Sequence, residues 1–80
     1  MRLETIKMLI MECVPHEPGR QTTFTALYSS VDSYSVELGY HLERPAFDRA
    51  INALNNEQCL VVFDVNDIRP TQYGLNAYSD

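Results

Sequence analysis

Three stretches of the chain space their hydrophobic residues at intervals of three and four, as an amphipathic helix does. They cover residues 2–14, 22–39 and 45–56. Pro15 ends the first stretch, because proline lacks the N–H that would continue a helix. Pro45 suits the first turn of the third, where that N–H has no partner within the helix. The sequence therefore predicts three helices, each with one face turned toward a common core.

The second stretch ends in a segment that fits two structures. The hydrophobic residues Tyr34, Val36, Leu38, Tyr40 and Leu42 alternate with polar ones, as in a half-buried strand. The same segment fits a short helix from Ser33 to Leu38, which Gly39 ends in a left-handed conformation. The helical pattern that resumes at Pro45 favours the helix. Thr22 or Thr23 offers a side-chain oxygen to cap the start of this region.

A hairpin is predicted over residues 59–69. The apolar run from Cys59 to Phe63 is typical of a strand, the polar segment from Asp64 to Asp67 of a turn, and Ile68 with Arg69 of a brief return strand. Thr71 can cap a last helical turn over residues 71–78. Together these elements predict one domain over residues 1–80, mainly α with a small β-hairpin.

Two segments of the sequence resemble winged helix-turn-helix domains. The first is Glu37-Leu38-Gly39, a turn, Arg44-Pro45-Ala46-Phe47-Asp48-Arg49-Ala50-Ile51-Asn52-Ala53-Leu54, and then Cys59-Leu60-Val61. The second is Ile68-Arg69-Pro70-Thr71-Gln72-Tyr73-Gly74-Leu75, which is similar to the segment that closes the wing in MarR- and PadR-like regulators. The resemblance covers residues 33–78 at the level of the superfamily. It implies a winged helix-turn-helix fold and a small transcriptional regulator whose second helix enters the major groove of DNA.

In such a fold the apolar faces meet in one core. We expect that core to contain Ile6, Leu9, Ile10, Leu38, Leu42, Phe47, Ile51 and Leu54, closed from the hairpin by Leu60, Val62 and Val65. Removing the core face leaves the candidate DNA-binding residues Arg44, Ala46, Arg49, Asn52 and Asn55, to which the hairpin adds Arg69. Arg49 and Asn52 are the candidate base readers, since Arg can bridge guanine and Asn adenine. Any solvated helix carries similar residues, so the pattern alone does not establish a site.

The negative charge of the chain argues against DNA binding. Eleven Asp and Glu residues outnumber six Lys and Arg, which gives a formal charge of -5. Asp64 and Asp67 occupy the wing tip, and Asp48 lies between two arginines of the predicted recognition helix. Carboxylates facing phosphates weaken binding. The alternative is a winged-helix interaction module or inhibitor, of viral or mobile-element origin, that binds a larger basic protein and no DNA.

The oligomeric state rests on the first helix. Met8 and Met11 lie beside its main apolar stripe, so they either fill gaps in the core or form a dimer contact. A homodimer is expected, since it would also double the contacts to DNA.

The remaining chemistry predicts no enzyme. Cys13 and His16 have a metal-like spacing, but His41 and Cys59 are 18 residues apart, so a zinc site is not expected. No catalytic or cofactor residues are predicted. Two cysteines without paired spacing fit a reducing cytoplasm. No apolar run is long enough for a membrane span, and the N-terminal segment lacks the pattern of a secretion signal.

Overall fold

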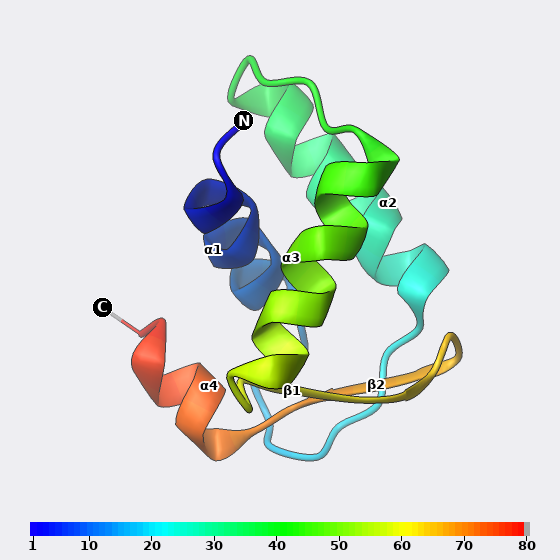
Figure 1. Ribbon diagram of the computed structural model, residues 1–80, viewed down its shortest axis with the longest axis vertical. Coiled ribbons are helices and arrows are strands. Elements are labelled where there is room, and N and C mark those ends of the chain that lie inside the picture. The colour runs from blue at the N-terminus through cyan, green and yellow to red at the C-terminus, as the bar shows by residue number, and fades with distance from the viewer. Residues whose placement is uncertain (80) are drawn as a thin grey trace.

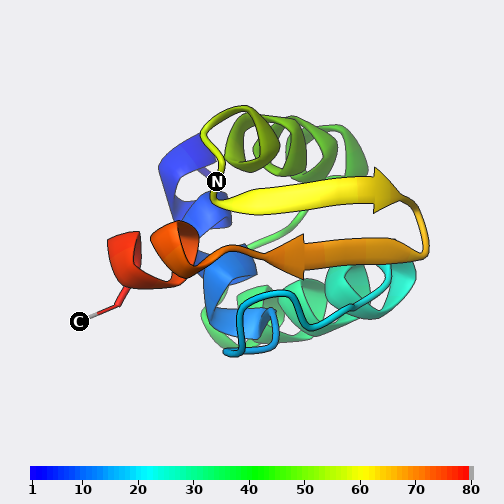
Figure 2. The ribbon, with the colours of Figure 1, turned by 90° about the horizontal axis from the view of Figure 1, so that it is seen from below.

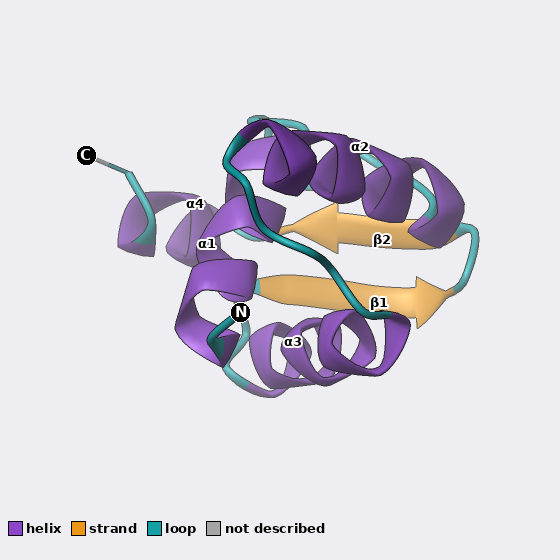
Figure 3. Cartoon of the chain, turned by 90° about the horizontal axis from the view of Figure 1, so that it is seen from above, coloured by secondary structure: helices purple, strands orange, loops and turns teal. Residues whose placement is uncertain are grey.

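The structure is a computed structural model that describes residues 1–79. Its elements in chain order are α1 (Leu3–Cys13), α2 (Phe24–Glu37), α3 (Arg44–Asn56), β1 (Leu60–Asp64), β2 (Asp67–Pro70) and α4 (Gln72–Ala77). The hairpin of β1 and β2 crosses beneath the lower ends of α2 and α3 in Figure 1. Seen from above, α2 lies on the β2 side and α3 on the β1 side (Figure 3). This mainly helical, winged-helix-like arrangement confirms the predicted fold class.

Local backbone chemistry sets the ends of the helices. The hydroxyl of Thr23 accepts a hydrogen bond from the Ala26 N–H at 3.1 Å and caps α2. The hydroxyl of Thr71 caps α4 in the same way, from the Gly74 N–H at 2.9 Å. Gly39 has φ +81°, the left-handed conformation expected for the residue that ends the second helical region. The predictions for these caps and for Gly39 are confirmed.

Of the two structures predicted for the segment that begins at Ser33, the favoured helix is confirmed, and its residues as far as Glu37 are the last part of α2. This helix runs without a break from Phe24 to Glu37, so Ser33 continues it and begins no new element. Residues 22 and 23 precede it, which makes the predicted helical region of 22–39 too long at its start. The reason is tertiary, because Thr22 pairs with a strand that lies 46 residues further along the chain.

The hairpin is antiparallel, with Val62 opposite Ile68. Thr22 adds a third extended segment beside β2, where it donates to the Ile68 oxygen at 2.8 Å and accepts from the Ile68 N–H at 2.9 Å. Figure 2 shows this segment running alongside β2. The Phe24 N–H also donates to the Val65 oxygen at 2.7 Å. The start of α2 is therefore fastened to the tip of the hairpin.

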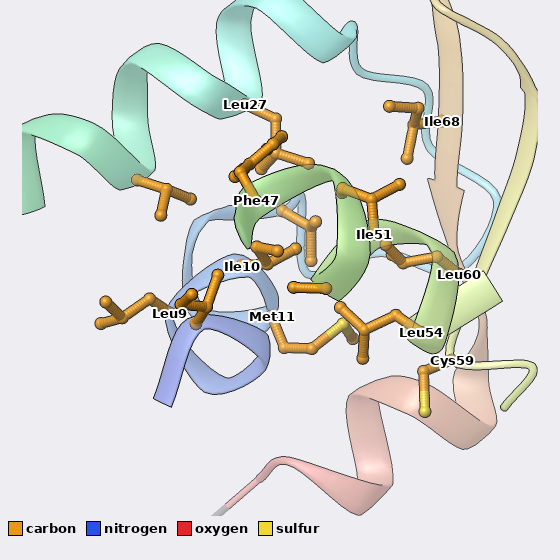
Figure 4. Packing of buried hydrophobic residues seen from close by; sticks show 14 of the residues in the cluster. Leu9, Ile10, Met11, Leu27, Phe47, Ile51, Leu54, Cys59, Leu60 and Ile68 are labelled. Atoms are coloured by element: carbon orange, nitrogen blue, oxygen red, sulfur yellow. The ribbon is translucent and has the colours of Figure 1, made fainter. Parts of the chain in front are cut away.

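The core lies where α1, α2 and α3 meet beside the hairpin (Figure 4). Its buried hydrophobic residues include Ile6, Leu9, Ile10, Met11, Leu27, Val31, Leu42, Phe47, Ile51, Leu54, Leu60 and Ile68. Two residues predicted to be in it are not. Leu38 is 51% exposed, because α2 turns Leu27, Val31 and Ser35 inward and ends before Leu38. Val65 is 66% exposed in the hairpin turn.

Candidate binding site on helix α3 and the hairpin

The outward face of α3 is polar and open to solvent. Phe47 and Leu54 turn the opposite face of the helix into the core. Arg49 and Asn52, three positions apart, are both exposed on the outward side. Within residues 1–79, neither side chain makes an ion pair or a hydrogen bond. The structure thus leaves the two predicted base readers available to a ligand.

Arg44 is exposed but makes contacts with neighbouring side chains of the same molecule. Its Nε lies 3.4 Å from Asp48 Oδ1, a long contact on the surface. Its guanidinium carbon lies 4.4 Å from the ring centre of Phe24 and 5.3 Å from that of Tyr28. A guanidinium stacked on aromatic rings gains a cation–π attraction. Arg44 therefore joins the start of α3 to the first turn of α2.

Ala46 and Asn55 have structural roles on the flanks of α3. Ala46 is half-buried and packs against the core, although it was expected on the exposed face. The side-chain oxygen of Asn55 accepts a hydrogen bond from the Val62 N–H at 3.2 Å. That contact ties α3 to β1 and occupies the amide oxygen that would read a base.

Arg69 lies on the outer face of the hairpin and is paired there. Its Nε and Nη2 donate to the two carboxylate oxygens of Asp67 at 2.8 and 3.2 Å. The hydrogen bonds from Arg69 to Asp67 raise the pKa of the guanidinium. Its carbon also lies 5.1 Å from the ring centre of Phe63, which is largely exposed. Arg69 was expected to contact DNA, but its positive charge is already paired with the Asp67 carboxylate.

Ion pairing extends to most cations of the chain. Lys7 pairs with Glu4 and Glu57, and Arg20 contacts Glu17 at 3.7 Å. Among residues 1–79, only Arg2 and Arg49 of the six cations make no ion pair. Residues 43–69, which carry α3 and the hairpin, contain five carboxylates against three arginines. This region therefore presents no excess of positive charge.

A groove of about 340 Å³ lies between α3, the start of α2 and the hairpin. Its apolar lining includes Phe24, Ile51, Val62 and Val65, and its polar lining consists of Asp48, Asn52 and Asp64. Asp64 Oδ1 accepts from the Asn66 N–H at 2.7 Å, which fixes that carboxylate at the hairpin turn. The sequence did not predict the groove. Val65, which lines it, was expected in the core instead.

The cysteines and histidines are dispersed. Within the described part of the chain, no three His, Cys, Asp or Glu side chains gather as metal ligands would. His16 Nε2 lies 3.1 Å from the Glu12 backbone oxygen instead. Burial is the main cause that raises the pKa of both the Cys13 and the Cys59 thiol. A thiol held in its protonated form is a poor nucleophile and a poor ligand.

Comparison with known proteins assigns the chain to no family, so its class is defined by its structure. No protein-family model matches the chain, and neither the curated proteins nor the solved structures contain a significant match. Helices and hairpin define the class as a small helical domain with a winged-helix-like arrangement. None of the helices in residues 1–79 has both the length and the apolar character needed to cross a membrane.

Proposed function

We propose that this protein is a winged helix-turn-helix domain that binds the basic surface of a protein partner through α3 and the hairpin. The order of the helices and the hairpin supports membership of the superfamily, as do the left-handed Gly39 and the pairing of Thr22 with Ile68. Function has to be argued from the site, because one fold hosts many activities.

The observation that carries the proposal is the position of the carboxylates. Asp48 from α3 and Asp64 from the end of β1 both line the groove between α3 and the hairpin, next to the face that would meet a DNA backbone. Phosphate binding depends on cations that release counterions, and Arg44 and Arg69 are already paired with carboxylates. A cationic protein surface is electrostatically complementary to this face. Binding of this kind suits an adapter or an inhibitor.

Site-specific photocrosslinking in the source cells tests this proposal. A benzophenone amino acid in place of Asn52 or Val65 is expected to trap a protein partner, since both residues line the groove. The matched control places the same group at Ser30, which is exposed on α2. A partner trapped equally well from Ser30, or no trapped protein at all, would contradict the proposal.

Duplex DNA is the second candidate, favoured by Arg49 and Asn52. Both are exposed and make no intramolecular bond within residues 1–79, and their side chains suit guanine and adenine edges. Selection from a random duplex library tests this alternative. If a sequence is enriched, Arg49→Ala should weaken its binding by about 1–3 kcal/mol and leave the salt dependence largely intact.

The homodimer and the cytoplasmic location remain predictions. Met11 is buried in the core, whereas Met8 is about half exposed on α1 and is available for a contact between copies. Sedimentation equilibrium at tens of micromolar should show a dimer that Met8→Glu dissociates. A monomer at that concentration would contradict the predicted dimer.

The predicted cytoplasmic location is supported by the two free cysteines, which fit a reducing compartment.

A further inference from the structure

The lining of the groove between α3 and the hairpin combines apolar side chains with two carboxylates. Ile51 from α3 and Val62 from β1 contribute apolar side chains, and the exposed Val65 extends the apolar lining to the hairpin turn. Asp48 lines the groove from α3, and Asp64 lines it from the end of β1. An occupant must therefore offer both an apolar segment and a positive charge.

Both carboxylates keep capacity to accept further hydrogen bonds. Asp64 uses Oδ1 for the Asn66 N–H, and Asp48 uses Oδ1 for the long contact with Arg44. Within residues 1–79, the Oδ2 atom of neither carboxylate has a hydrogen-bond partner. An ionised carboxylate can accept about four hydrogen bonds. Arg44 itself lies against the rings of Phe24 and Tyr28.

We propose that this groove receives an arginine side chain from the protein partner, an inference that rests on the proposed function. The aliphatic stem of arginine can cover Val62 and Val65 while its charged end stays among polar groups. The planar guanidinium matches carboxylate geometry and donates two hydrogen bonds to one carboxylate. The side-chain oxygen of Asn52 can accept another. A phosphate in the same place would meet two like charges.

Titration with a small probe tests the groove without knowledge of the partner. The probe is N-acetyl-arginine methylamide, added at millimolar concentration to ¹⁵N-labelled protein and followed by amide chemical shifts. Shifts are expected at Asn52, Val62, Asp64 and Val65. The citrulline analogue has a nearly identical shape without the charge. It should bind roughly threefold to tenfold more weakly, the effect expected for loss of partly exposed ion pairs.

Two variants and a matched control locate the effect. The double variant Asp48→Asn/Asp64→Asn should weaken arginine binding by a similar factor, about threefold to tenfold. The control, Glu12→Gln/Glu37→Gln, removes two exposed carboxylates away from the groove and should bind arginine as the wild type does. Val65→Lys places a cation in the groove from an exposed position and should abolish the shifts. Val65→Lys therefore still tests arginine binding in the groove if the double variant disturbs the hairpin.

The possible outcomes distinguish a failure of the arginine site from a failure of the proposed function. Selective arginine shifts that the groove variants reduce would support the inference. Equal binding of citrulline, or no shifts in the groove while a protein is still trapped from Asn52, would overturn the arginine site alone. Salt-sensitive shifts with a selected DNA duplex, together with no trapped protein, would overturn both the site and the proposed function.

Discussion

Lys7 on α1 and Glu57 just beyond α3 are fifty residues apart in the chain, and their Nζ and Oε2 atoms lie 2.8 Å apart. The lysine is only 5% exposed and has a second, longer contact with Glu4 at 3.3 Å. The hydrogen bond to Glu57 is the main cause that raises the pKa of Lys7, against the opposing effect of burial. This pair fastens the first helix to the end of the third.

The two partners of this pair should respond differently to substitution. Glu57→Ala leaves a buried ammonium with Glu4 alone, so the free energy of unfolding should fall by about 1–3 kcal/mol. Lys7→Met removes the buried charge itself and keeps the volume. It should change stability by less than about 1 kcal/mol, because the half-exposed Glu57 can be hydrated.

Urea unfolding followed by circular dichroism measures both effects. Glu12→Ala, at an exposed position on α1, is the matched control and should stay within about 0.5 kcal/mol of the wild type. A loss from Lys7→Met as large as that from Glu57→Ala would contradict the stated asymmetry.

A pair of leucines tests the extent of the core. Leu54 is fully buried and Leu38 is 51% exposed. Leu54→Ala should cost about 2–5 kcal/mol, since it leaves a cavity among α1, α3 and the hairpin. Leu38→Ala should change stability by no more than about 0.5 kcal/mol. Similar losses from both, measured by urea unfolding, would place Leu38 back in the core.

Gly74 is required by a close approach of two backbones. A Cβ at this position would lie less than 3.0 Å from backbone atoms of Cys59. Gly74→Ala should therefore displace α4 from the start of β1 and destabilise the fold by about 1–3 kcal/mol. Thermal unfolding checks this, with Asn76→Ala on the same helix as the exposed control. Equal melting temperatures for Gly74→Ala and the wild type would show that α4 can move without cost.

Stability should decline at alkaline pH. Burial raises the pKa values of Cys13, Cys59 and Tyr78, and ion pairing raises that of Lys7. Each group holds its proton more tightly in the folded state than in the unfolded state. Their contribution is therefore complete below the unfolded pKa values and is lost as pH rises through the folded ones. With ordinary values from about 8.5 for cysteine to about 10.4 for lysine, the fall should begin above about pH 8.

Urea unfolding at a series of pH values measures this decline. The double variant Cys13→Ala/Cys59→Ala should be less stable overall but should show a flatter profile between about pH 8 and pH 10. A free energy of unfolding that rises over this range in the wild type would contradict the assignment.

Much of the secondary structure followed from short-range chemistry. The periodicity around Leu9, the caps Thr23 and Thr71 and the left-handed Gly39 all act within a few residues, so the sequence could predict them. The exposed positions of Arg49 and Asn52 followed in the same way from the period of the helix. The class of fold was therefore predictable.

Other features depended on contacts between distant segments. Thr22 is extended because Ile68, 46 residues further along the chain, pairs with it. Whether a cation is free to bind a ligand also depends on residues distant in the chain. Arg44, for example, stacks on the ring of Phe24.

By itself, the sequence determined the order of the helices, the hairpin and the acidic balance, because these depend on residue type and spacing along the chain. Only the tertiary structure decided which charges meet. It paired Lys7 with Glu57, fifty residues further along the chain, and brought Asp48 and Asp64 to the same groove from two different elements. Charge interactions depend on distance in space, so a total of -5 did not reveal where on the surface the carboxylates would gather.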